Sequence, residues 1–234
     1  MILSSAAQML NGNAAPALPW LPSGAIAFLD FVDGHYYSGG QSREIEDLLG
    51  GGFDAGSLLA PGLYFDNPPF NANRPIAIGP LFDDIVAGLA AGCTFVFEID
   101  FRSPPFGSFI HILDNPSYNA ADFWVSAYVD ADVYVENQGV IGFEGSNGGF
   151  SSDAGIKRIA FTFARHDGGN YEYAGSTEGT AAATQVDTTA PFTAIDTITI
   201  GHDGDDEEIL DDAYIRSITL YPAKLPADLP ALSA

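Results

Sequence analysis

The chain has 234 residues, of which 47% are hydrophobic and 17% are charged, and its 31 acidic and 8 basic residues give a formal net charge of -23. Phosphate groups are bound by clustered Lys and Arg, so this charge argues against binding to nucleic acid or anionic membranes. No apolar run reaches the ~18 residues of a membrane span. The length suits one β-sandwich, a class that often runs to about 200–250 residues.

The first 24 residues differ from the rest of the chain. Residues 11–23 are rich in Pro and Ala, carry no charge and have no periodicity. Prolines remove backbone donors and favour extended conformations. We therefore predict an extended arm over 1–24 and a jelly-roll domain over 25–234. The apolar residues that would anchor the arm, on its own domain or on a partner chain, are Leu18, Trp20 and Leu21.

Short strands and two helices are expected between residues 25 and 91. Ser42 is a good N-cap for a short helix over 43–49 that would end at three glycines. Leu81, Ile85 and Leu89 repeat at helical spacing, which predicts a helix over 80–91 that ends at Gly92. The expected strands in this part are 25–32, 62–65 and 75–78.

Residues 93–102 show the clearest strand pattern. Phe95, Phe97, Ile99 and Phe101 alternate with polar residues, so they form one buried face, and the single cysteine, Cys93, is in phase with them as a buried thiol. Further strands are expected at 107–113, 122–129, 131–136, 138–143, 157–164, 170–174, 181–186, 194–200 and 213–221. About a dozen short strands indicate an all-β fold, a two-sheet antiparallel jelly-roll sandwich with one or two short helices.

Four segments resemble one known family. They are 25–40, 157–173, the strand Ile195-Asp-Thr-Ile-Thr-Ile-Gly201 and the closing run from Ala213-Tyr-Ile-Arg-Ser-Ile-Thr-Leu-Tyr-Pro to Leu229. Together they resemble concanavalin A-like (laminin-G-like) lectin and glucanase domains, in the form found in tailed-phage virion proteins. The resemblance covers roughly 25–230 and implies the jelly roll. It implies little about function, because this fold hosts lectins, hydrolases and structural modules.

The glucanases of that family carry two glutamates and an aspartate on one strand face. Glu98 and Asp100 begin this pattern, but Arg102 and Ser103 stand where the family has its acid/base glutamate. Retaining glycoside hydrolysis needs a second carboxylate about 5 Å from the nucleophile. We therefore expect that the chain is not an enzyme.

Residues 203–212 contain seven acidic residues and no basic residue. Calcium takes 6–8 oxygen ligands, and close carboxylates repel one another without a counterion. The EF-hand spacing is absent, so a solvated acidic loop and a calcium site both stay open. No other cofactor is indicated. The candidate ligands are Asp203, Asp205, Asp206, Asp211 and Asp212.

Two functions remain as hypotheses. The first is a non-enzymatic structural or decoration protein of a tailed-phage virion, anchored by the arm to other virion proteins or to copies of itself, and made in the host cytoplasm. The alternative is a carbohydrate-binding module for receptor recognition, with calcium as a helper. Candidate sugar-binding residues, which combine aromatic platforms with loop amides, are Tyr118, Asn119, Trp124, Asn147 and Tyr171.

Overall fold

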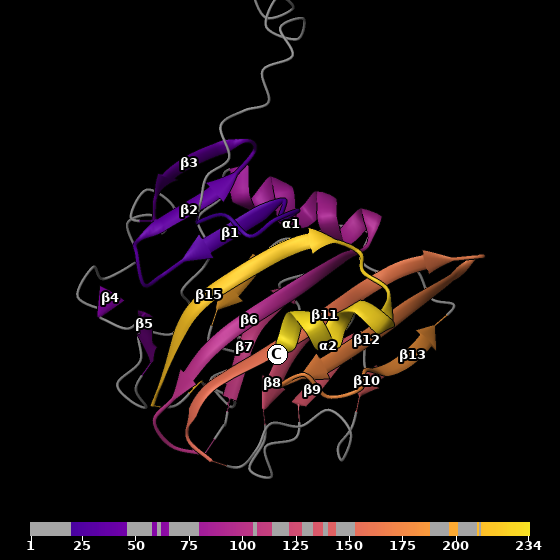
Figure 1. Ribbon diagram of the computed structural model, residues 1–234. Coiled ribbons are helices and arrows are strands. Elements are labelled where there is room, and N and C mark those ends of the chain that lie inside the picture. Colours follow the sequence, from indigo (N-terminus) through magenta and orange to yellow (C-terminus); the bar gives the residue numbers. More distant parts are fainter. Residues whose placement is uncertain are drawn as a thin grey trace, which may run out of the picture.

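The computed structural model describes residues 20–45, 58–59, 62–65, 80–104, 107–113, 122–127, 133–137, 140–143, 153–187, 197–200, 210 and 212–234. For 58–59, 65, 80–82, 107–143, 187 and 197–199 it describes the backbone alone. The strands form two antiparallel sheets that stack as a sandwich (Figure 1), which confirms the predicted fold class. No helix in this described part of the chain has the length and apolarity to span a bilayer.

The larger sheet has ten strands. Its main order is β13-β12-β11-β6-β15-β1-β2-β3, while β5 pairs with the other end of β15, and β4 pairs with β5. The strands are β1 (Ala27–Asp30), β2 (His35–Ser38), β3 (Gln41–Glu44), β4 (Leu58–Leu59), β5 (Gly62–Phe65), β6 (Cys93–Phe101), β11 (Gly155–Asp167), β12 (Asn170–Thr177), β13 (Ala183–Asp187) and β15 (Ala213–Pro222).

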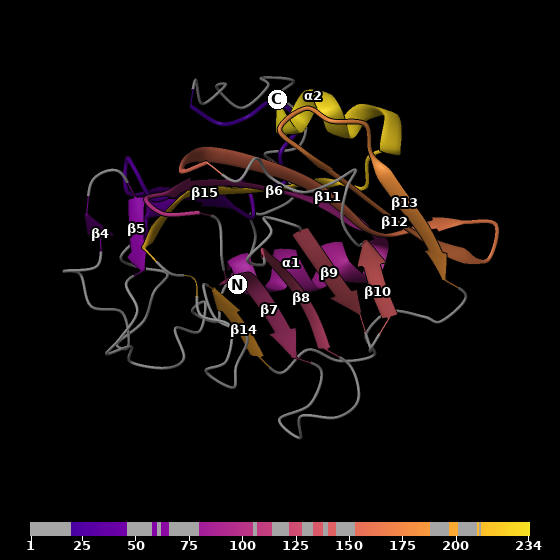
Figure 2. The ribbon, with the colours of Figure 1, turned by 90° about the horizontal axis from the view of Figure 1, so that it is seen from below.

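The smaller sheet has five strands in the order β10-β9-β8-β7-β14. They are β7 (Gly107–Leu113), β8 (Asp122–Ala127), β9 (Val133–Asn137), β10 (Val140–Phe143) and β14 (Thr197–Ile200). Figure 2 shows them as a second layer below the larger sheet, so the chain crosses between the layers after β6, after β10 and on both sides of β14.

The main core lies on the inner face of the larger sheet, and β6 supplies its centre. Phe95, Phe97, Ile99 and Phe101 are all at most 1% exposed, as the alternation predicts. Burying such side chains contributes about 1.5–3 kcal/mol each by transfer from water. Cys93 is buried with them, and this burial raises the pKa of its thiol. The thiol is therefore protonated and unreactive at neutral pH.

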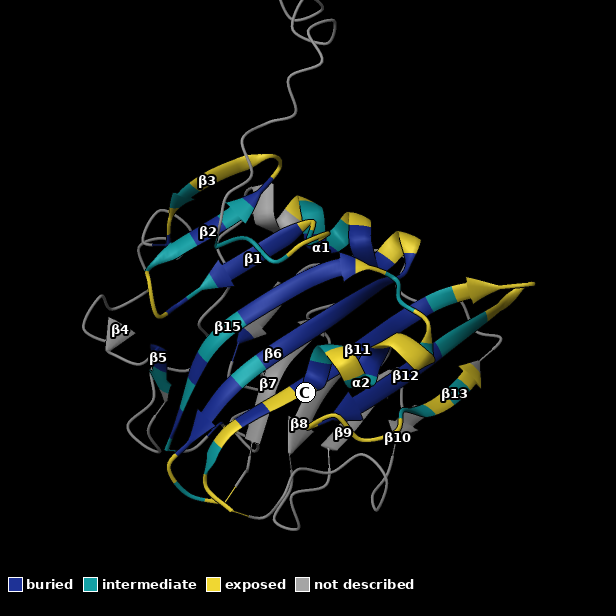
Figure 3. Ribbon diagram, in the orientation of Figure 1, coloured by how far each residue is buried: buried dark blue, intermediate teal, exposed yellow. Residues whose placement is uncertain are grey.

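The outer face of the larger sheet is also partly covered, which Figure 3 shows as buried strands on both sides of a short C-terminal helix. The 3-10 helix η5 (Pro226–Asp228) and the helix α2 (Leu229–Ser233) pack there on a second apolar cluster. The cluster consists of Val96, Ala160, Ala174, Tyr221 and Leu229. Hydrogen bonds also tie α2 to the sheet, because the hydroxyls of Ser176 and Ser233 lie 2.8 Å apart.

The helix α1 (Pro80–Ala91) has the predicted bounds. Its buried residues Ile85 and Leu89 belong to the main core. Gly88 has no side chain to hold the helix away, so its backbone lies directly against Cys93 and Leu220 of the sheet. The helix ends at Gly92, where φ is +81°, a conformation that glycine adopts without the steric cost of a side chain.

One predicted helix is wrong at its start. Residues 41–44 form strand β3, in which Ser42 lies opposite Tyr37 of β2, so Ser42 does not cap a helix over 43–49. The reason is the dipeptide Gly39-Gly40, whose φ angles of 58° and 76° form the tight turn of a β-hairpin. The expected strand at 75–78 lies outside the described residues, and β2 to β4 were not predicted as strands.

Candidate functional site

A depression of about 490 Å³ lies on the outer face of the larger sheet. Strands β6, β11 and β15 form its floor, the turn after β1 forms one side, and α2 forms the other. It is lined by Pro22, Phe28, Asp30, Val32, Asp33, Val96, Glu98, Arg158, Arg216, Ser217, Thr219, Tyr221, Ala231 and Leu232. These residues come from distant parts of the chain, so the depression exists only in the folded domain.

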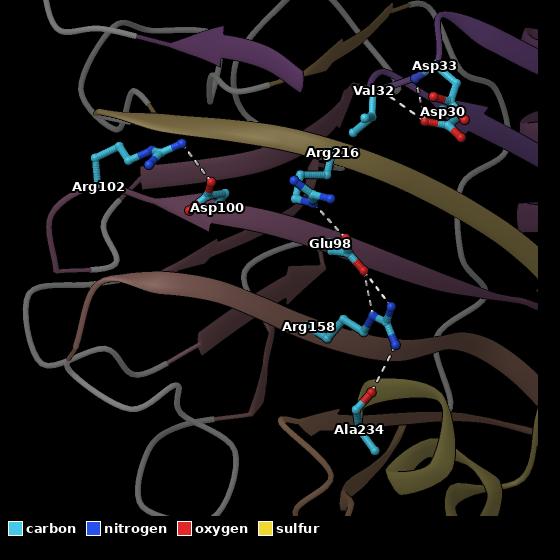
Figure 4. Close-up of polar contacts among 9 residues, drawn as sticks. All are labelled: Asp30, Val32, Asp33, Glu98, Asp100, Arg102, Arg158, Arg216 and Ala234. Carbon is cyan, nitrogen blue, oxygen red and sulfur yellow. Dashed lines mark hydrogen bonds and ion pairs between the residues drawn. The ribbon is translucent and has the colours of Figure 1, made fainter. Parts of the chain in front are cut away.

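One carboxylate between two guanidinium groups forms the polar part of the floor (Figure 4). Arg216 donates from Nε to Oε1 of Glu98 at 2.7 Å. Arg158 donates to the other oxygen, Oε2, from Nε at 2.8 Å and also from Nη2. Its Nη1 donates to the backbone oxygen of Ala234, the residue after α2, at 2.9 Å. Both oxygens of Glu98 are therefore occupied by arginine donors.

The strand register explains why these three side chains meet. Glu98 of β6 lies directly opposite Arg158 of β11 on one side and opposite Ser217 of β15 on the other. A β-bulge between Ile215 and Ser217 inserts Arg216 as an extra residue into β15. Bulges redirect a side chain, and this one turns the guanidinium of Arg216 toward Glu98. The backbone oxygen of Arg216 accepts a hydrogen bond from Phe31 at 2.9 Å, which ties the bulge to the chain after β1.

Burial and hydrogen bonding act in opposite directions on Glu98. Its side chain is 17% exposed, and this desolvation alone would raise the pKa of the carboxyl. The hydrogen bonds from Arg216 and Arg158, together with their positive charges, outweigh the burial and hold the pKa of Glu98 below its ordinary value. Glu98 is therefore a carboxylate at neutral pH, and the three groups carry one net positive charge.

Arg216 keeps unused donors. Its side chain is 23% exposed, and only Nε is bonded to Glu98. Among the described residues, the two terminal amino groups of Arg216 have no hydrogen-bonding partner. A guanidinium that is fixed at one nitrogen and open at the others can bind a planar oxyanion through two parallel hydrogen bonds.

Acceptors and apolar surface surround this charged floor. The carboxylate of Asp30 accepts hydrogen bonds from the backbone nitrogens of Val32 and Asp33, at 3.0 Å each, and so shapes the turn after β1. Val32, with 43% of its surface exposed, lines the same side. Burial raises the pKa of Tyr221, against the opposing charge of Arg158, so its hydroxyl stays protonated. The depression thus offers cationic donors, carboxylate acceptors and apolar contacts together.

A second polar group lies beyond Glu98 on the same sheet face. Arg102 forms an ion pair with Asp100, with 2.9 Å between Nη2 and Oδ2. The guanidinium of Arg102 also lies over the ring of Tyr214, 5.0 Å from its centre. On that ring packs Tyr64 of β5, with 4.6 Å between the ring centres. This Arg102 cluster lies outside the depression and adjoins it along β6 and β15.

The structure places the two carboxylates of the predicted glucanase pattern, Glu98 and Asp100, on one face, but arginine side chains bind both of them. Glu98 and Asp100 both point to the outer face, as the alternation predicts (Figure 4). Glu98 is held by Arg158 and Arg216, and Asp100 is held by Arg102. A carboxylate with both oxygens engaged by guanidinium groups is a poor nucleophile, because attack would require these bonds to break.

Of the predicted sugar and calcium residues, the structure describes the side chains of Tyr171 and Asp212, and neither lines the depression. Tyr118, Asn119 and Asn147, as well as Asp203, Asp205, Asp206 and Asp211, lie outside the described residues. Trp124 is in β8, where only the backbone is described, opposite Glu136 of β9. Tyr171 lies at the end of the β11–β12 hairpin, where its ring contacts His166. Asp212 accepts a long hydrogen bond of 3.4 Å from Tyr64. Within the described ranges, no three His, Cys, Asp or Glu side chains gather as a metal site.

The predicted anchors of the arm are only partly described. Leu18 lies outside the described residues, while Trp20 and Leu21 are half-buried. The Trp20 ring contacts Phe28 and His35 of its own domain, with 6.1 Å between the ring centres in each case. The segment after Trp20 then passes Pro22, which lines the depression.

Sequence reasoning identified Glu98 but missed Arg158 and Arg216. Both arginines lie in strands that were predicted, at 157–164 and 213–221. The available signal was the small number of basic residues. The chain has 8 basic residues against 31 acidic ones, so each arginine has many carboxylates with which it can pair. The two arginines lie on either side of Glu98 because of the strand order and the bulge in β15. The sequence reveals neither of these features.

Comparisons with known proteins concern the fold. No family model matches the chain, and no curated protein matches it. Among solved structures, the Ruminococcus gnavus IT-sialidase CBM40 bound to α2,3-sialyllactose matches with a TM-score of 0.54 and 13% identity, over 73% of this chain and 97% of that domain. The same domain bound to α2,6-sialyllactose gives a TM-score of 0.51 and 14% identity, over 64% of this chain and 87% of that domain.

A leech intramolecular trans-sialidase complexed with 2,7-anhydro-Neu5Ac matches with a TM-score of 0.50 and 12% identity, over 72% of this chain. The match covers only 27% of the leech protein. The bacterial matches are carbohydrate-binding domains of the β-sandwich type. At these identities the likeness shows the fold alone, which this chain shares as an antiparallel β-sandwich.

Proposed function

We propose that this chain is a non-catalytic carbohydrate-binding module and that the depression over Glu98, Arg158 and Arg216 binds an acidic sugar. The observation that carries the proposal is the open guanidinium of Arg216, which faces a depression in a chain whose net charge is -23. Such a chain repels anions in general. The floor of the depression carries one net positive charge, with the carboxylates of Asp30 and Asp33 at its side, so the open guanidinium is a specific feature that suits one oxyanion.

The residues that line the depression indicate that the bound carboxylate belongs to a sugar. A sugar acid presents a carboxylate, several hydroxyls and apolar C–H faces in one ring. Arg216 supplies donors for the carboxylate, Asp33 on the rim supplies an acceptor for a hydroxyl, and Val32 supplies apolar contact. Binding pockets commonly combine apolar walls with a few placed polar groups in this way. The sialyllactose bound by two of the similar domains is a ligand of this class.

The same residues support the absence of catalysis. Retaining glycosidases use two carboxylates about 5 Å apart, one of them free to act as nucleophile. Here Glu98 is engaged by two arginines, and Arg102 stands where the sequence pattern of the glucanases has its acid/base glutamate. We therefore propose that bound glycan is released unchanged.

A place in a tailed-phage virion stays a prediction from the sequence, as do contacts with other virion proteins and self-association. A carbohydrate-binding module in receptor recognition would serve such a particle, and it would equally serve a secreted protein. A calcium ion at residues 203–212 also remains a prediction.

The test is calorimetric titration of the full chain with 3′-sialyllactose, with lactose as the matched neutral control. We expect sialyllactose to bind with a dissociation constant on the order of millimolar or tighter, and lactose to give no measurable heat. Equal affinity for the two sugars, or no binding of either, would overturn the proposal. A repeat with a calcium chelator tests the calcium prediction, because an assisting ion would make the affinity fall.

A further inference from the structure

We infer that the binding surface extends past the depression to a second subsite, formed by Asp100 and Arg102, which takes the neutral sugar unit next to the acidic one. This inference rests on the proposed function and deepens it by naming the ligand class: an acidic oligosaccharide of at least two units. The juxtaposition that carries it is the position of the Arg102 cluster directly beside the Glu98 network on one sheet face (Figure 4).

The spacing of the two groups is set by the strand. Glu98 and Asp100 are two residues apart on β6 and point to the same face, so their backbone positions are separated by about 6.6–6.8 Å. On β15 the partners follow the same order, since Ser217 lies opposite Glu98 and Tyr214 lies opposite Asp100. The two groups therefore lie next to each other along β6 and β15, as two subsites for neighbouring units of one oligosaccharide would.

Arg102 is held in place although it is exposed. Its side chain is 47% exposed, but the ion pair with Asp100 and the contact with the Tyr214 ring fix its guanidinium. The backbone nitrogen of Arg102 donates to the oxygen of Asp212 at 2.8 Å, which also fixes the start of the side chain. These contacts hold the guanidinium in one position before a ligand arrives, so binding costs little side-chain entropy.

The free atoms of this pair match sugar hydroxyls. Among the described residues, Nε and Nη1 of Arg102 and Oδ1 of Asp100 have no hydrogen-bonding partner. The exposed guanidinium of Arg102 supplies the donors, and the carboxylate of Asp100, which is 12% exposed, supplies an acceptor beside them for an adjacent sugar hydroxyl. The pair carries no net charge, so it has no preference for a second acidic group. This distinguishes the Asp100–Arg102 subsite from the positively charged floor of the depression.

The experiment compares two probes on the full chain: the methyl glycoside of N-acetylneuraminic acid, which has one ring, and 3′-sialyllactose. We expect the wild-type chain to bind the trisaccharide about tenfold more tightly, since hydrogen bonds to charged groups are the stronger class. Arg102→Ala should reduce this ratio to below about twofold and leave the affinity for the one-ring probe unchanged. Asp100→Ala should reduce the ratio in the same way, since it removes the acceptor.

Arg43→Ala is the matched control, because it also removes one arginine from the larger sheet, at the distant strand β3. It should leave both affinities unchanged, and thermal unfolding of each variant checks that the fold is intact. Equal binding of the two probes by the wild-type chain, or an equal loss of both on Arg102→Ala, would overturn the second subsite while the proposed function stands. If neither probe binds, both proposals fall together.

Discussion

Two β-bulges in the larger sheet each place an arginine beside acidic side chains, but the two clusters have opposite charge ratios. In β11 the register shifts between Thr162 and Arg165, and Arg165 then meets two carboxylates, Glu172 at 2.6 Å and Asp167 at 3.4 Å. In β15 the bulge at Arg216 adds a second arginine to one carboxylate, Glu98.

The ratio of charges separates a structural cluster from a binding surface. The hydrogen bond to Glu172 raises the pKa of Arg165, whose charge is fully compensated near the turn of the β11–β12 hairpin. Among the described residues, the side chain of Arg216 bonds to Glu98 alone and shares this carboxylate with Arg158, so donors remain open toward the depression. An arginine that is paired with two carboxylates stabilises the fold. Two arginines that share one carboxylate keep free N–H donors that can bind a further anion.

The largest expected effect is a loss of binding affinity, and it tests the difference between the two bulges directly. Arg216→Ala should weaken binding of 3′-sialyllactose by about 50-fold or more, since a bidentate, charge-assisted pair is lost. Arg165→Ala removes the same charge from the other bulge and should leave the affinity within about twofold, because long-range charge effects are screened. Calorimetry on both variants is the measurement. Similar losses in the two variants would mean that overall charge, and not the site, governs binding.

The contrast between the bulges also shows what could be foreseen from sequence. The alternation in residues 93–101 predicts the central strand, and the helical spacing of Ile85 and Leu89 predicts α1, because both patterns are local. The meeting of Glu98, Arg158 and Arg216 is not local, since β11 and β15 are separated by three other strands in the chain. The hairpin at Gly39-Gly40 was missed because Ser42 was also a good helix cap.

The second expected effect concerns stability at the β11 bulge. Gly92, at the end of α1, has φ of +81°, and a side chain there would come within 2.8 Å of the backbone oxygen of Ala164 in the bulge. Gly92→Ala should therefore lower the free energy of unfolding by about 2–3 kcal/mol, from backbone strain together with the clash. Denaturant unfolding monitored by circular dichroism measures the change.

Gly168→Ala is the control for this prediction. Gly168 also has a positive φ, +62°, but no atom lies within 4 Å of the position of a side chain. Its substitution should cost only the strain, about 1 kcal/mol. The difference between the two variants isolates the contact between α1 and the bulge, and equal losses would show that this contact contributes nothing.

The smallest expected effect is the pH dependence of the Glu98 network. Because the folded-state pKa of Glu98 is lowered, its contribution to stability is present above the ordinary value of 4.5 and is lost as the pH falls through the folded-state pKa. Glu98→Gln should lower the free energy of unfolding at pH 7 by about 1 kcal/mol, a value reduced by solvent screening of the exposed Arg158. At pH 3 the difference from the wild-type chain should be smaller. A difference that is the same at both pH values would mean that Glu98 acts through its shape and not through its charge, and the two bulges would then differ in geometry alone.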